Sequence, residues 1–290
     1  MPAYRDIVRR IDSIKNTQKI TKAMQVVAAT RLRRAQQAVQ ATRPYAEKML
    51  EVLQTAGERA TEYRHPFLVR REGKRGVMIL VTTDKGLCGA INVNSIRAAT
   101  RFMNEHYPDE QRYVTIGRKG RDLLLRYRRA VIADVSGISD RPTVAEVLPV
   151  ITVALEEYAA GKTDAVLLCY EKWISTMKQE ATVHTLIPAE IPKREGEGGP
   201  RADYIYEPDP ESVLDALLPR YVETQVFQAV LENKASEYSA KMIAMQNATK
   251  AAGDLIQDLA LFANKVRQAG ITTELMEIVS GAEAMRASGR

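Results

Sequence analysis

The sequence predicts an α/β protein in which a long antiparallel coiled coil of the N- and C-terminal helices carries an inserted Rossmann-like α/β domain. Two observations predict the coiled coil: both ends of the chain read as long helices, and their apolar residues recur in steps of four and three. A third observation predicts the inserted domain, because buried strands alternate with helices between residues 76 and 186.

The C-terminal stretch, from Pro219 to about Ala287, predicts a single helix about 100 Å long at 1.5 Å per residue. So long a periodic run is typical of a coiled coil, a membrane span or a helical repeat, and no window in it has 18 uncharged apolar residues. Two apolar rows can be read along it: Leu255, Leu259, Phe262, Val266, Ala269, Thr273, Met276; and Ile271, Leu275, Ile278, Ala282, Met285. Such a helix cannot bury itself alone, so we expect it to be surrounded by other protein.

The N-terminal stretch, from Ala3 to about Thr42, contains neither Pro nor Gly and predicts a second long helix. Its main row is Ile7, Ile11, Ile14, Gln18, Thr21, Gln25, Ala28, Leu32, Ala35, and a second row is Ile20, Met24, Val27. The polar residues in the middle of the main row predict a poor self-sufficient coiled coil, as expected if the helix turns inside a sheath. Pro44 predicts a kink or a junction near Arg43, after which residues 45–63 resume the helical pattern.

The middle of the chain predicts a mostly parallel sheet. We expect strands at 76–83, 112–116, 130–135 and 164–170, an edge strand at 176–186, and helices at 90–107, 119–127 and 143–160. Thr143 is the expected N-cap of the last of these helices. The predicted parts are thus an N-terminal coiled-coil helix (1–62), a central α/β domain (76–186), a flexible Pro- and Gly-rich linker (187–210) and a C-terminal part (211–290). Within that last part, a short helix at 211–218 precedes the long one, which starts at Pro219.

The net charge of +6 is distributed unevenly. Residues 1–50 hold 11 Lys or Arg and 3 acidic residues, 11 − 3 = +8, so the rest of the chain sums to −2. This asymmetry has three interpretations: a solvated face, a helix that binds nucleic acid, or a rod that faces acidic protein. Residues 5–43 contain no aromatic residue, which weakens the nucleic-acid interpretation.

The residue types argue against catalysis by this chain alone. The two cysteines, Cys88 and Cys169, form no CxxC pair, and His65, His106 and His184 are scattered, so we expect no zinc site. We find no nucleophile paired with a base and no converging carboxylates. No hydrophobic signal sequence precedes the first helix, so we expect free thiols in a reducing cytosol, and we expect no cofactor.

One turn deserves comparison with ligand-binding loops. Asp84, Lys85, Gly86 and Gly89 belong to the turn D-K-G-L-C-G, which follows a buried strand and precedes a helix, where α/β folds often bind phosphates. The turn lacks both GxGxxG and GxxxxGK[ST], although Lys85 and the helix N-terminus could attract an anion. We expect a tight turn without a ligand, in which Asp84 acts as a local cap.

Four segments, in this order, resemble the gamma subunits of F-type ATP synthases: residues 11–32, 84–89, 235–249 and 271–284. The likeness extends over essentially the whole chain. It departs from the family pattern at Lys241, where Arg is common, and at Ala251, where Asn is expected. Gly281, between two small residues, would cost about 1 kcal/mol relative to Ala in a helix interior, and it suggests close approach by a neighbour.

The resemblance implies a rotor shaft. In that family the terminal helices lie inside a hexameric ring of alpha and beta subunits, and the α/β domain lies against the epsilon subunit and the c-ring. Proton flow turns the c-ring and the shaft, which drives the beta catalytic sites through their conformations. The implied location is the cytoplasmic face of a bacterial cell membrane, as a peripheral protein held there only through the complex, with no nucleic acid bound. The cysteine-bearing insertion of chloroplast relatives is absent, so we expect no thiol switch.

The resemblance also assigns contact residues. Arg267, Gln268, Thr272 and Glu274 resemble residues that engage the beta-subunit catch loops. Met24 and Lys22 resemble the matching contact on the N-terminal helix, while Glu237 and Lys241 belong to the contact-forming run at 235–249. The +8 segment could then face acidic loops of beta. The competing hypothesis is a free-standing coiled-coil protein that binds nucleic acid.

Overall fold

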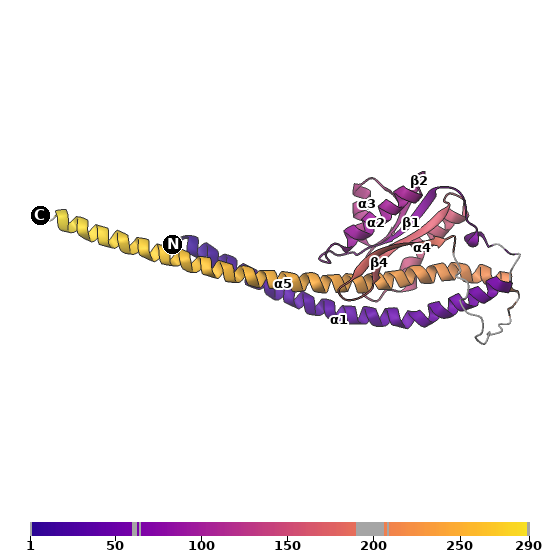
Figure 1. The fold of residues 1–290 in the computed structure, drawn as a ribbon, viewed down its shortest axis with the longest axis horizontal. Coiled ribbons are helices and arrows are strands. Elements are labelled where there is room, and N and C mark those ends of the chain that lie inside the picture. The colour runs from indigo at the N-terminus through magenta and orange to yellow at the C-terminus, as the bar shows by residue number, and fades with distance from the viewer. Residues whose placement is uncertain (1, 60–62, 64, 190–205, 208, 289–290) are drawn as a thin grey trace. The chain divides into compact units, whose positions relative to one another are not determined.

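The computed structural model describes residues 2–59, 63, 65–189, 206–207 and 209–288 of the chain (Figure 1). The chain divides into two compact units, one formed by residues 28–241 and the other by residues 1–27 together with 242–290. Most of the predicted linker, 187–210, lies outside the described residues, and the predicted domain boundaries remain predictions.

The N-terminal helix α1 (Pro2–Arg59) continues through Pro44, so a junction near Arg43 is wrong, while the alternative of a kink there stays a prediction. Proline removes a single intrahelical hydrogen bond, and the helix continues because its next turns pack in the core, where Met49, Leu53 and Ala56 are buried. The predicted main row is confirmed, because all of its members are buried or half-buried. In the second row, Ile20 and Val27 are exposed.

The C-terminal helix α5 (Pro210–Ser288) begins nine residues before Pro219, so the predicted start and the separate helix at 211–218 are both wrong. Asp209 caps the helix: its Oδ1 accepts a hydrogen bond from Ser212 N at 2.8 Å and its Oδ2 accepts one from Ser212 Oγ at 3.0 Å. Pro210 then occupies the first helical position, where its missing N–H costs nothing. Pro210 and Pro219 are both suited to the first helical position, and the helix begins at Pro210 because Asp209 caps it there.

The unit of residues 28–241 is built on a five-stranded sheet with the order β3-β2-β1-β4-β5. The strands are β1 (Arg75–Val81), β2 (Glu110–Ile116), β3 (Ala130–Val135), β4 (Ala165–Trp173) and β5 (Gln179–Ile187). The first four are parallel, as predicted, and β5 takes the predicted place at the edge, where it pairs antiparallel with β4. Central strand β1 is covered on both faces, which explains its unbroken apolar sequence.

Helices cover both faces of the sheet (Figure 1). The helices between the strands are α2 (Ile91–His106), α3 (Arg118–Arg126) and α4 (Val144–Ala159), and a 3-10 turn, η1 (Pro66–Leu68), precedes β1. Met78 and Leu80 face a core shared with α2 and α3. Val77 and Ile79, one residue out of phase, face a larger core with α4, α1 and α5. At the start of α4, the Glu146 carboxylate accepts a hydrogen bond from the N–H of the predicted cap Thr143 at 3.1 Å.

Within this unit, α1 and α5 run antiparallel. Thr224 lies against Met49, with 3.9 Å between Oγ1 and Sδ, whereas Arg31, earlier on α1, lies over the ring of Tyr238, later on α5. Residues from both helices join one apolar cluster with the sheet. The α/β domain and the helix pair beside it therefore share a core.

The other unit contains only the distal parts of the two helices, again packed against each other. Thr21 Oγ1 lies 2.8 Å from Thr249 Oγ1, and Gln18 Nε2 donates to Thr249 O at 3.3 Å. A row of α5 residues that are buried or half-buried here recurs in steps of four and three: Met245, Thr249, Ala252, Ile256, Leu259, Ala263, Val266 and Gly270.

This seam corrects the first apolar row predicted for α5. Leu259 and Val266 belong to the seam, but Leu255 and Phe262 are 42% and 54% exposed. Small residues such as Ala252 and Ala263 occupy several of the buried or half-buried positions, so large apolar residues alone do not mark the whole seam. Counting only the largest apolar residues therefore places the predicted row partly off the packed face.

No helix in the described part of the chain is both long and apolar enough to cross a lipid bilayer.

Candidate functional site

The turn at 84–89 is held by its own hydrogen bonds. Thr83 Oγ1 donates to Lys85 O at 2.6 Å, and Asn92 donates its amide to Thr83 Oγ1 at 2.8 Å while accepting from Thr83 N. Leu87 and Gly89 both adopt positive φ, 64° and 65°, so the chain reverses sharply there. The geometry is that of a self-contained tight turn.

Asp84, Lys85 and Gly86 have separate roles in this turn. The Asp84 Oδ1 accepts a hydrogen bond from Arg118 N at 3.0 Å, so it caps the start of α3, 34 residues along the chain, rather than acting locally within its own turn. Lys85 is exposed and Gly86 is half-buried. The polar groups that close the turn are therefore engaged with the protein itself.

Helix α5 covers the carboxyl ends of β1 and β4, the place where parallel α/β sheets usually bind ligands. Ala240 packs against Cys88 and Ile91 beside the turn. At the end of β4, Glu171 N donates to Asn233 Oδ1 at 3.2 Å, and Ser236 Oγ donates to Glu171 O at 2.8 Å. A Rossmann-like sheet in this chain thus uses its usual ligand crevice to hold a helix.

A buried carboxylate lies under this contact. Glu171 is 2% exposed, and its Oε1 accepts a hydrogen bond from Ser95 Oγ at 2.9 Å. Burial raises the pKa of Glu171 to about 6, although the Ser95 hydrogen bond acts in the opposite direction. This carboxyl group therefore loses its proton at a pH close to neutral.

Glu237 and Lys241 form an ion pair on α5. Lys241 Nζ lies 2.8 Å from Glu237 Oε1, and Lys234 Nζ lies 3.9 Å from Glu237 Oε2. The three side chains are only 5%, 13% and 12% exposed, in the order Glu237, Lys241, Lys234. The structure thus brings this predicted pair together, and it directs the carboxylate inward.

The next residue, Tyr238, connects α5 to α1 and to the loop between β3 and α4. Its hydroxyl donates to Asp140 Oδ1 at 2.5 Å, and Arg31 of α1 donates to the same carboxylate at 3.2 Å. Lys234 Nζ donates to Ile138 O at 3.1 Å. Burial raises the pKa of Asp140, but the Tyr238 hydrogen bond and the charge of Arg31 outweigh it, so the pKa of this carboxyl is lowered. Charged groups from three elements therefore meet at this point.

The remaining predicted contact residues lie in the other unit. Arg267, Gln268, Thr272 and Glu274 are all exposed on α5, with Thr272 Oγ1 donating to Gln268 O at 3.0 Å. On α1, Lys22 is exposed and donates to Gln25 Oε1 at 3.5 Å, while Met24 is half-buried.

The chain is similar in sequence to known proteins over almost its whole length. A sequence model described as ATP synthase matches residues 3–285. The ATP synthase gamma chain of Acidovorax sp. (strain JS42) is 46% identical over 288 residues, which cover 98% of this chain and 100% of the relative. The gamma chain of Delftia acidovorans is 47% identical over 290 residues, with the same coverage. The chain belongs to the ATP synthase gamma chain family. It is therefore a non-catalytic subunit of that complex.

Solved structures agree with this fold. A chain of the Euglena gracilis mitochondrial ATP synthase, from an assembly of OSCP, F1 and c-ring, aligns with a TM-score of 0.69 and covers 100% of this chain and 96% of its own length. A rotor chain from the same organism gives a TM-score of 0.65, with 93% and 99% covered. Both are 18% identical, so this likeness concerns the fold alone.

For a gamma chain, the sequence interpretation missed the residues that fix α5 onto the sheet. Asn233, Ser236 and Asp140 are small polar residues without a motif, and the partners they bind lie 62 to 98 positions away. In the described part of the chain, no cluster of three His, Cys, Asp or Glu side chains is arranged to hold a metal ion.

Proposed function

We propose that this gamma chain is the central shaft of a proton-translocating ATP synthase and couples rotation of a c-ring to the conformational cycle of the beta-subunit catalytic sites. The proposed partners are the alpha and beta subunits around the distal helices, and the epsilon subunit and c-ring at the α/β domain. The proposed location is the cytoplasmic face of a bacterial membrane, reached only through the complex. The two Euglena gracilis fold relatives come from rotor and F1/c-ring assemblies, which supports membership of such a complex.

One observation carries the proposal: every side chain from Ile271 to Met285 is exposed. Six of them are large and apolar, with exposures between 45% and 73%: Ile271, Leu275, Met276, Ile278, Val279, Met285. Water-exposed apolar surface of this extent marks a protein contact. At about 100° per residue these six residues spread over about half of the helix circumference, and the side chains on its other side are exposed as well, which suits a helix contacted from several directions by a ring of subunits. This stretch contains the second predicted apolar row, and Gly281, where an added Cβ would meet no atom within 4 Å, lies within it.

The exposed polar residues next to this surface suit a tuning role. We assign Arg267, Gln268, Thr272 and Glu274 to contacts with the beta catch loops, and Lys22 and Met24 to the corresponding contact of α1. An exposed ion pair contributes at most about 1 kcal/mol, so such contacts adjust coupling, whereas the apolar surface provides the main contact with the ring.

Glu237 and Lys241 support a different assignment from the one that the resemblance implies. Their carboxylate and ammonium groups are satisfied by each other and are largely buried, so we propose that they act first on the shape of α5 and its attachment to the α/β domain. Contact with another subunit would use the exposed remainder of the Lys241 side chain. The turn at 84–89 also helps to attach α5 to the α/β domain, because its Cys88 packs against Ala240.

Copurification tests the proposal. The full chain, expressed with untagged alpha and beta subunits, should purify as part of a particle that hydrolyses ATP, and alone it should show negligible ATPase activity. A matched variant, Leu275→Glu with Ile278→Glu, should weaken assembly, whereas Lys250→Glu, also exposed on α5, should not. A monomer that instead retards DNA or RNA at physiological salt would support the nucleic-acid hypothesis and refute the shaft.

A further inference from the structure

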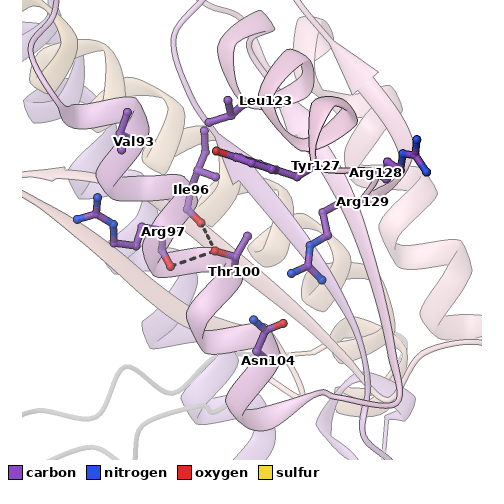
Figure 2. Close-up of a pocket in the computed structure, with 9 residues that line it drawn as sticks. All are labelled: Val93, Ile96, Arg97, Thr100, Asn104, Leu123, Tyr127, Arg128 and Arg129. Atoms are coloured by element: carbon purple, nitrogen blue, oxygen red, sulfur yellow. Dashed lines mark hydrogen bonds between the residues drawn. The ribbon is translucent and has the colours of Figure 1, made fainter.

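A pocket of about 520 Å³ lies on the outer face of the α/β domain, between α2 and the turn that follows α3 (Figure 2). Its volume falls within the range of small-molecule sites. The side chains that line it are Val93, Ile96, Arg97, Thr100, Asn104, Leu123, Tyr127, Arg128 and Arg129. Two of these residues, Ile96 and Leu123, also pack in the core that α2 and α3 share with the sheet, so the floor of the pocket is part of the folded domain.

The charge of the pocket is entirely positive. Three of its nine side chains are arginines and none is acidic. Among the described residues, no carboxylate oxygen lies within 4.0 Å of the Arg97, Arg128 or Arg129 guanidinium. The segment 118–129 adds to this field, since it holds six basic residues and one acidic residue, 6 − 1 = +5. The N-terminal +8 is therefore not the chain's only basic region, and this second one is localised on a folded surface.

A hydrogen bond to Gln111 positions the Arg129 guanidinium at the pocket. Its Nη1 donates to Gln111 Oε1 at 3.0 Å, and Gln111 Nε2 donates in turn to Asn104 Oδ1 at 3.0 Å. The other guanidinium N–H groups of Arg129 and the amide N–H groups of Asn104 remain available as donors. Figure 2 shows Arg129 extending from the turn toward α2, between the Tyr127 ring and Asn104, with Arg97 and Arg128 at opposite sides of the pocket.

Arg128 occupies a backbone position that favours glycine. It follows the C-cap of α3 with φ 54°, and the bonds around it, Arg128 N to Leu125 O and Arg129 N to Leu124 O, both 3.0 Å, define a Schellman motif. A side chain at that position costs conformational energy that glycine avoids. An arginine kept there at such a cost points to a use for its charge.

We propose that this pocket binds a phosphate-bearing small ligand. The phosphate oxygens would accept hydrogen bonds from Arg129 and Asn104, with Arg97 and Arg128 adding charge from the rim, since guanidinium groups match phosphate oxygens in geometry. The flat ring of Tyr127, 64% exposed, and the half-buried Leu123 offer a surface for an aromatic or apolar body attached to the phosphate. A nucleoside polyphosphate and a phospholipid headgroup both present this chemistry.

Binding of defined probes to the full chain tests the site. ATP without metal, inorganic phosphate, and vesicles of phosphatidylglycerol or of phosphatidylcholine are titrated by calorimetry or flotation at physiological salt. Arg97→Gln and Arg128→Gly each remove one positive charge from the rim, and each should weaken binding by up to about fivefold, the ratio that corresponds to an exposed charge interaction of about 1 kcal/mol. Arg128→Gly should keep or raise the melting temperature, so a loss of binding in this variant cannot come from unfolding. The matched control is Arg126→Gln, which removes the same charge from an exposed neighbour outside the pocket.

Each outcome decides the question. Saturable ATP binding that falls in the two pocket variants and persists in the control supports the site with a nucleotide as its ligand. The same pattern with phosphatidylglycerol vesicles, and not with ATP, supports it with a lipid headgroup. Equal weakening in all three variants would show a general charge effect and overturn the proposal, as would the absence of binding to every probe.

Discussion

Lys241 Nζ lies 2.8 Å from Glu237 Oε1, and both side chains are largely buried. The two residues are one helical turn apart, and Lys241 also lies over the Tyr238 ring, 5.8 Å from its centroid. Tyr238 in turn binds Asp140, so the pair is part of the contact between α5 and the α/β domain. Residues that resemble coupling contacts in the family thus begin as internal contacts in this chain.

Lys241→Met should destabilise the fold, because it leaves the Glu237 carboxylate buried with Lys234 as a more distant partner. Breaking a buried pair typically costs about 3–5 kcal/mol, and the remaining lysine should reduce this to roughly 2–3 kcal/mol. Chemical unfolding followed by circular dichroism measures the change. Lys241→Arg keeps the charge and should remain within about 1 kcal/mol; equal losses in both variants would refute the pairing argument.

Asp164→Asn should destabilise the start of β1. The Asp164 carboxylate accepts hydrogen bonds from Arg75 Nε at 3.0 Å, Arg75 Nη2 at 2.8 Å and the Arg75 backbone N–H at 3.0 Å. An amide can reproduce only part of this, so we expect a loss of about 1–3 kcal/mol in unfolding free energy at pH 7.

The same pair sets a dependence on pH. The hydrogen bonds from Arg75 lower the pKa of Asp164 below its usual 3.8 despite burial. The stabilisation is therefore complete above about pH 4 and is lost as the pH falls through the lowered pKa. The difference between the native chain and Asp164→Asn should shrink as the pH falls below 4. A difference that stays constant down to pH 2 would contradict this account.

Glu171→Gln should stabilise the chain at neutral and higher pH. The folded-state pKa of about 6 exceeds the ordinary 4.5, so the folded protein holds this proton more tightly than the unfolded chain. Stability from the neutral form is complete below about pH 4.5 and is lost as the pH rises through 6. The variant should gain about 1–2 kcal/mol at pH 8 and almost nothing at pH 4.5, measured as the shift of the urea midpoint. Glu156→Gln, an exposed carboxylate on α4, is the control and should show no such pH dependence.

Periodicity and turn chemistry made much of this fold predictable. The α1 row from Ile7 to Ala35 is correct because Ile, Leu and Ala recur at the helical spacing over many turns. Strand β1 was recognisable because both of its faces are covered, and Thr143 because Glu146 stands three residues later. These features are local, so the sequence carries them directly.

Features that depend on distant partners were harder to predict. The seam of α5 mixes small residues such as Ala252 and Ala263 with Leu259 and Val266, whereas Leu255 and Phe262 are exposed, so hydrophobicity alone selects part of the wrong face. The start of α5 depends on a single capping carboxylate, Asp209. The average charge beyond residue 50 is close to zero and conceals the pocket arginines, although six basic residues gather within 118–129.

Arg267→Gln should leave the fold unchanged, since Arg267 is exposed on α5. In a complete complex it should alter ATP-driven proton pumping relative to ATP hydrolysis by at most about fivefold, the ratio that corresponds to an exposed ion pair of about 1 kcal/mol. Proton uptake and ATPase rate are measured on the same membrane vesicles. Lys250→Gln removes a charge from the same helix and serves as the control; unchanged synthesis and hydrolysis in Arg267→Gln would remove this residue from the proposed contacts.

Rotation of the α/β domain relative to an immobilised ring of alpha and beta subunits tests the shaft most directly. Met177, at the tip between β4 and β5, is 78% exposed, whereas Cys88 and Cys169 are buried and the pKa of Cys169 is raised to about 12 by burial. A bead attached through Met177→Cys therefore reports on this domain selectively. The account predicts continuous rotation in one direction when ATP is supplied, and it would be contradicted by an assembled particle that hydrolyses ATP while the bead shows only undirected fluctuation.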